Sequence, residues 1–109
     1  MTNQTAARAF VALADPTRRR IFEALADSPQ PVGRLAELAP MSRPAVSQHL
    51  KVLTDASLVT SRAQGTRRIY ELDPRGLDGL RDYLDGFWNR SLASFKKVAE
   101  LSVDTEEHR

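Results

Sequence analysis

Residues 42–59 read SRPAVSQHLKVLTDASLV, and most of what the chain reveals about its fold begins here. At helical spacing, Val46, Leu50 and Leu53 share one face. The opposite face carries a hydroxyl, an amide and a cation but no carboxylate: it holds Pro44, Ser47, Gln48 and Lys51, with Arg43 at its edge. This face suits the acceptor-rich base edges and the phosphates of a DNA major groove. The alternative is an ordinary amphipathic surface helix, although such helices usually mix charges of both signs.

The segments before residue 42 predict three further helices: about Thr5–Leu13, Pro16–Ala26 and Val32–Leu38. Asp15 is expected to cap the second of them, with Pro16 at the first position, where a missing N–H costs nothing. The proline-rich stretch 27–31 is expected to be a loop. Residues 39–41 then form a tight turn and Ser42 caps the next helix, so the third and fourth helices make a helix-turn-helix.

The segments after residue 57 predict a hairpin and a long last helix. Leu58–Ala63 and Arg68–Leu72 are expected to be strands, joined by a turn at 64–67. Asp73 should cap a helix from Pro74 to about Leu101, followed by a frayed, charged tail at 102–109. The fold class is therefore mainly α with a small β-hairpin, in the order α-α-α-α-β-β-α, which is a winged helix-turn-helix. We expect a single domain over residues 1–109, with its core at about 5–101.

Composition and charge exclude several classes of protein. The 109-residue chain has no cysteine, which rules out a disulfide framework, a thiolate zinc site and a cysteine nucleophile. It has no apolar run of membrane-spanning length and no signal-peptide pattern, so we expect a cytoplasmic protein without a membrane partner. Residues 41–70 carry five cations and one anion, whereas residues 71–109 carry six cations and nine anions. A basic middle segment is typical of a nucleic-acid footprint, although scattered surface charge gives a similar imbalance.

Three ordered motifs carry a family resemblance: LADPTRRRI at 13–21, the stretch 42–59, and GTRRIY at 65–70. Together they resemble the ArsR-type bacterial repressors over roughly residues 8–100. That family consists of homodimeric winged-helix transcription factors, many of which release DNA on binding a metal ion. The resemblance implies that the helix after Ser42 is the recognition helix and the hairpin is the wing. One departure is Ser57, where the family commonly has glycine.

A second departure concerns metal. Metal-sensing members place cysteines in the third helix, or histidine and carboxylate ligands in the first or last helix. Here the third helix has no thiol, and the two histidines, His49 and His108, do not make a zinc site. Asp78, Asp82 and Asp85 have helical spacing and could hold a hard cation weakly, although a solvated acidic face is the more common reading. The resemblance therefore implies the metal-independent branch, and we expect no metal site and no cofactor.

The recognition helix divides its expected contacts by chemistry. Gln48 can bond adenine through two hydrogen bonds, and Ser47 is an adaptable short donor, so we expect both to reach base edges. Arg43 at the helix start could reach guanine or a phosphate, Pro44 a thymine methyl, and Lys51 a phosphate. The alternative is that these residues only fill an exposed helix face.

The wing is expected to add three cations, Arg62, Arg67 and Arg68, to the DNA-binding surface. Cations at a wing tip can reach the neighbouring minor groove or the backbone. An exposed hairpin is also a natural place for solubilising charge, and this reading stays open.

The last helix carries a wide aromatic stripe, too wide for a helix that covers a small core from one side. With Phe10 of the first helix it predicts a homodimer interface. The alternative, compatible with a dimer, is a pocket for a small apolar ligand between the subunits. The interface residues that we expect are Phe10, Leu84, Phe87, Trp88, Leu92 and Phe95.

These patterns predict a bacterial DNA-binding transcriptional regulator, a homodimeric repressor of an inverted-repeat operator, with its own promoter as one candidate target. No catalytic constellation is visible, so we expect no enzyme. We assign no small-molecule inducer. The alternative function is a protein-interaction module that uses a winged-helix scaffold only for dimerisation. The basic segment 41–70 argues against this alternative, because a pure scaffold needs no such bias.

Overall fold

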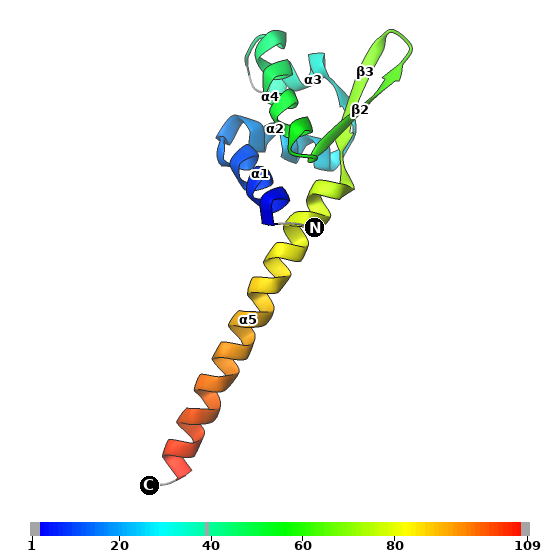
Figure 1. Cartoon of the computed structure of the whole chain (residues 1–109). Coiled ribbons are helices and arrows are strands. Elements are labelled where there is room, and N and C mark those ends of the chain that lie inside the picture. The colour runs from blue at the N-terminus through cyan, green and yellow to red at the C-terminus, as the bar shows by residue number, and fades with distance from the viewer. Residues whose placement is uncertain (1–2, 39, 108–109) are drawn as a thin grey trace.

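Helices dominate the computed structural model, which describes residues 3–38 and 40–107 (Figure 1). In chain order the elements are α1 (Asn3–Ala14), α2 (Pro16–Asp27), β1 (Gln30–Pro31), α3 (Val32–Leu38), α4 (Arg43–Asp55), β2 (Val59–Gln64), β3 (Arg67–Leu72) and α5 (Pro74–Glu107). The pair α3 and α4 forms the helix-turn-helix, and the β2–β3 hairpin forms the wing. The predicted winged helix-turn-helix is confirmed.

Three helices begin at the caps expected from the sequence. In each cap a side-chain oxygen of the residue before the helix accepts a backbone N–H from its first turn, which satisfies a donor that the helix itself leaves open. Asp15 accepts from Arg18 at 2.9 Å, Ser42 accepts from Ala45 at 3.3 Å, and Asp73 accepts from Arg75 at 3.0 Å. Local sequence therefore fixes where α2, α4 and α5 start.

The small sheet has three strands, and not only the two expected. Stretch 27–31 was expected to be a loop, but β1 pairs antiparallel with β3, in register Gln30 with Tyr70 and Pro31 with Ile69. The strand order is β1-β3-β2, so β1 lies at an edge, where a proline without an N–H is tolerated. Gln30 is also held from the other side, because its Nε2 donates to the carbonyl of Ala24 in α2 at 3.2 Å.

The wing pairs tightly along its whole length. Its register runs from Val59 opposite Leu72 to Gln64 opposite Arg67. Both strands therefore reach one residue further toward the tip of the hairpin than the sequence predicts. Gly65 in the turn has a φ of 62°, a left-handed conformation that glycine adopts at little cost. The hairpin projects away from the core (Figure 1), and its three arginines are exposed.

The core lies beneath α4, on the inner side of the helix-turn-helix. Val46, Leu50 and Leu53 are buried, as the helical spacing predicts, and they join buried residues of α2, α3 and β2. Ala9 and Ala12 are also buried, and their short side chains let α1 approach the core closely. Burying the apolar stripe of α4 fixes which of its faces points outward.

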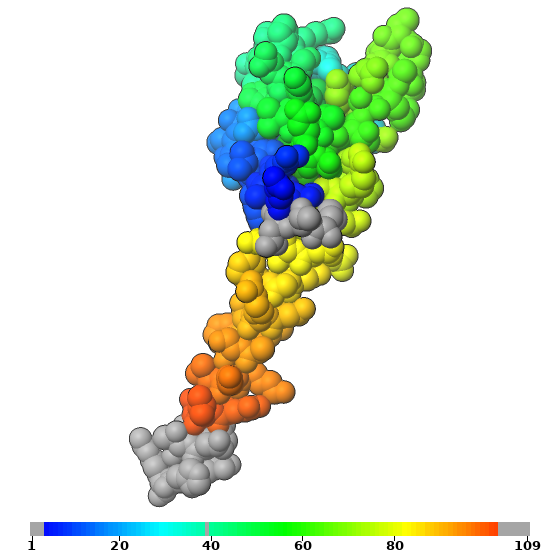
Figure 2. All heavy atoms as spheres, in the orientation of Figure 1, coloured from blue at the N-terminus to red at the C-terminus, as the bar shows by residue number. Residues whose placement is uncertain are grey.

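The last helix is longer than the sequence indicates. It was expected to end near Leu101 with a frayed tail at 102–109, but α5 continues to Glu107 because no glycine or proline follows Gly86. The molecule measures 74 × 27 × 21 Å, since α5 runs away from a head formed by the other elements (Figures 1 and 2). We call residues 84–101 of α5 the arm. None of the described helices combines the length and the apolar character needed to cross a membrane.

Candidate nucleic-acid interface

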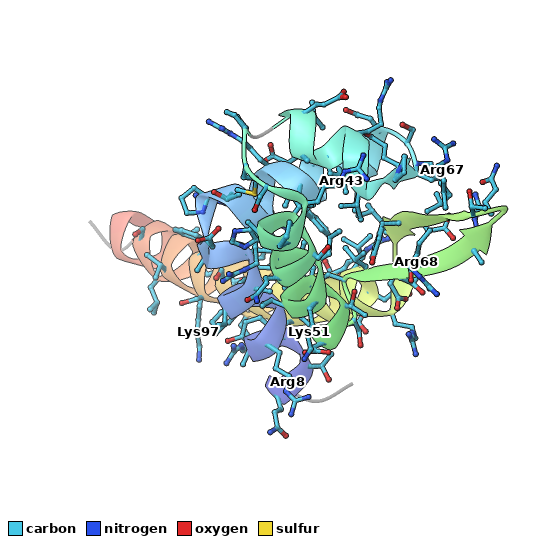
Figure 3. All side chains as sticks on the ribbon, turned by 90° about the horizontal axis from the view of Figure 1, so that it is seen from above. Arg8, Arg43, Lys51, Arg67, Arg68 and Lys97 are labelled. Atoms are coloured by element: carbon cyan, nitrogen blue, oxygen red, sulfur yellow. The ribbon has the colours of Figure 1, made fainter. Side chains whose placement is uncertain are left out.

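The outward face of α4 is the centre of the candidate interface. Its predicted contact residues are all exposed, whereas the apolar stripe on the other side of the helix is buried. Figure 3 looks onto this face, with Arg43 and Lys51 toward opposite ends of α4. The exposed residues are Arg43, Pro44, Ser47, Gln48 and Lys51. The helix therefore presents amide and hydroxyl groups flanked by cations, a combination able to bond base edges and phosphates.

The three wing arginines differ in their surroundings. Arg62 pairs with Glu71 at 3.6 Å and donates to Oε1 of Gln64 at 3.1 Å. Arg68 donates to the hydroxyl of Ser61 at 3.0 Å, across the hairpin. The side chain of Arg67 makes no hydrogen bond or ion pair with the described residues, so of the three its guanidinium is the most available to an incoming anion.

The structure brings Arg43 together with the wing tip but leaves the other contacts of α4 apart from it. Arg43, Arg67 and Arg68 line one hollow of about 420 Å³ between α3, the start of α4 and the wing. Ser47, Gln48 and Lys51 do not line that hollow. Sequence analysis did not single out Arg34 of α3, which joins the same hollow, because no helical or strand periodicity relates α3 to the wing.

Among the described residues, no group of three or more histidine, aspartate or glutamate side chains is placed to hold a metal ion. The carboxylate of Asp85, one of the three regularly spaced aspartates on α5, lies 3.8 Å from the guanidinium of Arg81. His49 is half-buried on α4, and His108 lies outside the described residues.

A ladder of aromatic rings joins α1 to α5. Phe10 meets Tyr83 edge-on at 5.6 Å between ring centroids, and Tyr83 meets Phe87 in the same way at 5.0 Å. The guanidinium of Arg90 lies 4.6 Å from the centroid of the Phe87 ring, a cation–π contact. Sequence analysis missed Tyr83, although its spacing of four residues from Phe87 placed it beside the stripe.

The predicted interface residues form an uncovered apolar surface. Every side chain from Leu84 to Leu101 is exposed, including Trp88 at 67% and Phe95 at 73%. Figure 2 shows the arm standing clear of the head. A surface with this many large apolar groups is typical of a protein–protein contact.

Comparison with known proteins gives relatives of the same kind. A helix-turn-helix domain family matches residues 13–62. The HTH-type transcriptional regulator Rv2034 of Mycobacterium tuberculosis is 56% identical, over 89% of this chain and 91% of its own length. The transcriptional repressor SdpR of Bacillus subtilis is 31% identical, over 74% of this chain and 90% of its own.

Solved structures agree with the sequence relatives. An ArsR-like transcriptional regulator from Rhodococcus sp. RHA1 superposes with a TM-score of 0.71 at 31% identity, covering 89% of this chain and 94% of that one. A homodimeric winged helix-turn-helix DNA-binding domain from Mycobacterium bovis superposes with a TM-score of 0.65 at 27% identity, covering 82% of each chain. From its motifs, its fold and these relatives, the chain belongs to the ArsR family of winged helix-turn-helix transcriptional regulators.

Proposed function

We propose that the protein is a homodimeric repressor that binds an inverted-repeat operator in double-stranded DNA and blocks the promoter there, its own promoter being the first candidate. The observation that carries this proposal is the division of α4 into two faces. Its apolar stripe is fully buried, which leaves Ser47 and Gln48 exposed on the other side, and the one carboxylate of the helix, Asp55, lies at its last residue. DNA is the partner whose grooves and phosphates complement such a face.

In this proposal the contacts divide into base reading and positioning. Gln48 and Ser47 read base edges, and Pro44 contacts a thymine methyl group. Arg43 and Lys51 bind phosphates at the two ends of α4. The wing arginines Arg62, Arg67 and Arg68 bind the backbone or the adjacent minor groove, and Arg62 has to exchange its contact with Glu71 to do so.

The arm supplies the second half of the proposal, because one winged helix reads only a half-site. Two copies must be held about one helical turn, 34–36 Å, apart to read an inverted repeat. The exposed stripe of α5 with Phe10 offers a surface for this, since a self-complementary patch generates a two-fold dimer. A homodimeric neighbour and a relative named as a repressor support the same assignment.

The proposal includes no metal and no catalysis. The chain has no cysteine, and the described residues form no metal-ligating group, so we assign it to a metal-independent branch of the family. Added Zn²⁺ or a chelator should leave operator affinity unchanged. A reproducible tenfold loss of operator affinity on adding low micromolar Zn²⁺ would contradict this part. The protein acts as one domain over residues 1–109, in the cytoplasm, where bacterial DNA lies.

A direct binding experiment tests the function. Fluorescence anisotropy should show tight binding to a duplex from the region upstream of the coding gene and weaker binding to a scrambled duplex of equal length. If the affinities for the two duplexes are equal and fall with salt, the protein binds DNA only non-specifically. Binding to neither, together with a stable dimer in sedimentation, would replace the proposal by the interaction-module function.

A further inference from the structure

A hollow rich in arginine lies beside the recognition helix. It has a volume of about 420 Å³ and is bounded by α3, the start of α4 and the wing. We call it the arginine cleft. Four arginines line it, Arg34, Arg43, Arg67 and Arg68, against one carboxylate, Glu37. In Figure 3, Arg43 on α4 and Arg67 on the wing lie near α3.

The guanidinium of Arg43 lies beside Gly33 of α3. A Cβ on Gly33 would lie 3.0 Å from Nη2 of Arg43, so the guanidinium rests against the bare backbone of α3. A side chain at residue 33 would require only the flexible end of Arg43 to shift. The Arg43 guanidinium thus lies beside α3 and lines the cleft.

The guanidinium groups of this cleft have few partners within the protomer. The side chains of Arg34, Arg43 and Arg67 make no hydrogen bond or ion pair with the described residues, while that of Arg68 makes one bond, to the Ser61 hydroxyl. Arg34 is also exposed. Several arginines without counter-ions around one concave site favour the binding of an anion, and guanidinium groups match the oxygens of a phosphate especially well.

A second hollow, between α2, α3 and residues 28–31, has a different balance of charge from the arginine cleft. It is larger, at about 670 Å³, and it shares Arg34, Arg67 and Glu37 with the arginine cleft. It adds Asp27 but neither Arg43 nor Arg68, so its two arginines face two carboxylates. An anion therefore prefers the cleft on the side of α4 and the wing tip.

We propose that the arginine cleft seats a phosphodiester group of the DNA backbone, with Arg34 of α3 as a phosphate contact outside the recognition helix and the wing. The inference rests on the proposed function, because the DNA strand is brought to the cleft by α4 and the wing. Glu37, facing the same site, opposes the phosphate and limits its affinity. The cleft fixes the position of the duplex without reading its sequence.

The test compares charge variants on two duplexes over a range of salt. For Arg34→Gln we expect affinity to fall about fivefold per cleft at about 0.15 M salt, on operator and scrambled duplex alike. The slope of log affinity against log salt should lose roughly one unit per cleft. Glu37→Gln should tighten binding to both duplexes. Arg81→Gln, which removes the same charge from exposed α5, is the matched control and should change neither quantity.

A second arm locates the contact on the DNA. In a series of duplexes that each carry one neutral methylphosphonate linkage, one position should weaken binding by the wild type but not by Arg34→Gln. If the losses of affinity caused by Arg34→Gln and by the methylphosphonate linkage simply add at every position, the inference is overturned. Unchanged duplex binding by Arg34→Gln overturns it as well. If the wild-type protein binds neither duplex, the proposed function itself is wrong, and this result is distinct from a failure of the cleft inference.

A third arm distinguishes the backbone from a free anion. Inorganic phosphate is titrated into the wild type and into Arg34→Gln by calorimetry at constant ionic strength. Saturable phosphate binding that is lost in Arg34→Gln, combined with unchanged duplex affinity, would make the cleft a free-anion site and overturn the DNA assignment. Loss of duplex affinity with no saturable phosphate binding supports the backbone contact.

Discussion

The backbone N–H of Gly76 donates to the carbonyl oxygen of Ser57 at 2.9 Å, and a Cβ on Gly76 would lie 2.3 Å from that same oxygen. The first turn of α5 therefore rests directly on the corner between α4 and β2. Ser57 itself has a φ of 59°, in the left-handed region, at the position where the family commonly has glycine. The corner that ends the recognition helix and the start of the long helix thus hold each other in place.

Replacing Gly76 with alanine should destabilise the fold. The new methyl group would overlap a backbone oxygen that cannot rotate away, so we expect a loss of about 1–3 kcal/mol in the free energy of unfolding. Urea unfolding at a fixed protein concentration measures it. Gly86→Ala is the matched control, since nothing lies within 4 Å of its Cβ, and helix propensity predicts a gain of up to about 1 kcal/mol. Equal stability of the two variants would contradict the close contact.

Substitutions on α4 and on the wing should separate sequence reading from general affinity. Gln48→Ala should relax base preference by about 1–3 kcal/mol, because a side-chain amide can form two bonds to adenine. Arg67→Ala should weaken binding to every duplex and reduce the salt slope by roughly one per contact. Binding isotherms with operator and scrambled duplex, at several salt concentrations, measure both effects. An equal loss of affinity for both duplexes in Gln48→Ala would contradict its role as a base contact.

The double variant Trp88→Glu with Leu92→Glu should abolish dimerisation and operator binding together. Both side chains are exposed on the arm, and burying an apolar side chain of this size contributes roughly 1.5–3 kcal/mol, counted twice in a symmetric contact. Analytical ultracentrifugation gives the oligomeric state, and anisotropy gives the affinity. A charge change elsewhere on α5, Asp78→Lys, serves as control. A monomeric wild type that still binds a palindromic site tightly would show the dimer proposal to be wrong.

Acid should weaken the start of α5 through Asp73. Its carboxylate is almost fully buried, and the hydrogen bonds from the Arg75 side chain hold its pKa below the usual range, although burial acts in the opposite direction. A lowered pKa means that the ionised form stabilises the fold above about pH 4 and that this contribution disappears as the pH falls through the folded-state pKa. Asp73→Ala should therefore cost about 1 kcal/mol at neutral pH, the usual value for a lost cap.

The pH dependence of that loss is the decisive measurement. The difference in unfolding free energy between the wild type and Asp73→Ala should shrink as the carboxylate protonates. Asp78→Ala, an exposed position on the same helix, should show no such trend. A difference that stays constant down to about pH 2 would mean that the charge of Asp73 does not matter.

Local sequence predicted the helices well, because their signals are local. The spacing of Val46, Leu50 and Leu53 gave the buried face of α4, and Asp15 and Ser42 gave two helix starts. Strand β1 was missed for a physical reason. It has two residues, one of them a proline, and it pairs with β3, far along the chain. A strand that exists through distant pairing leaves no periodicity of its own.

The candidate interface was predicted in part. The outward face of α4 follows from its buried face, so helical spacing alone is enough to place Ser47 and Gln48 on it. The arginine cleft has no such signal, because Gly33, Arg43 and Arg67 come from three elements that only tertiary packing brings together. The role of Tyr83 was not predicted, because its ring contacts Phe10 of α1, and the spacing of residues within α5 gives no information about contacts with another helix.

The arm has a thermodynamic consequence. Its side chains are exposed in the protomer, and an isolated helix of this length is only marginally stable in water. In the proposed dimer, ordering the arm and pairing two chains become one event, governed by mass action. The melting temperature should rise with protein concentration, and dilution should unravel the arm before the head. A regulator built this way senses its own abundance, since its folded fraction depends on how many copies are present.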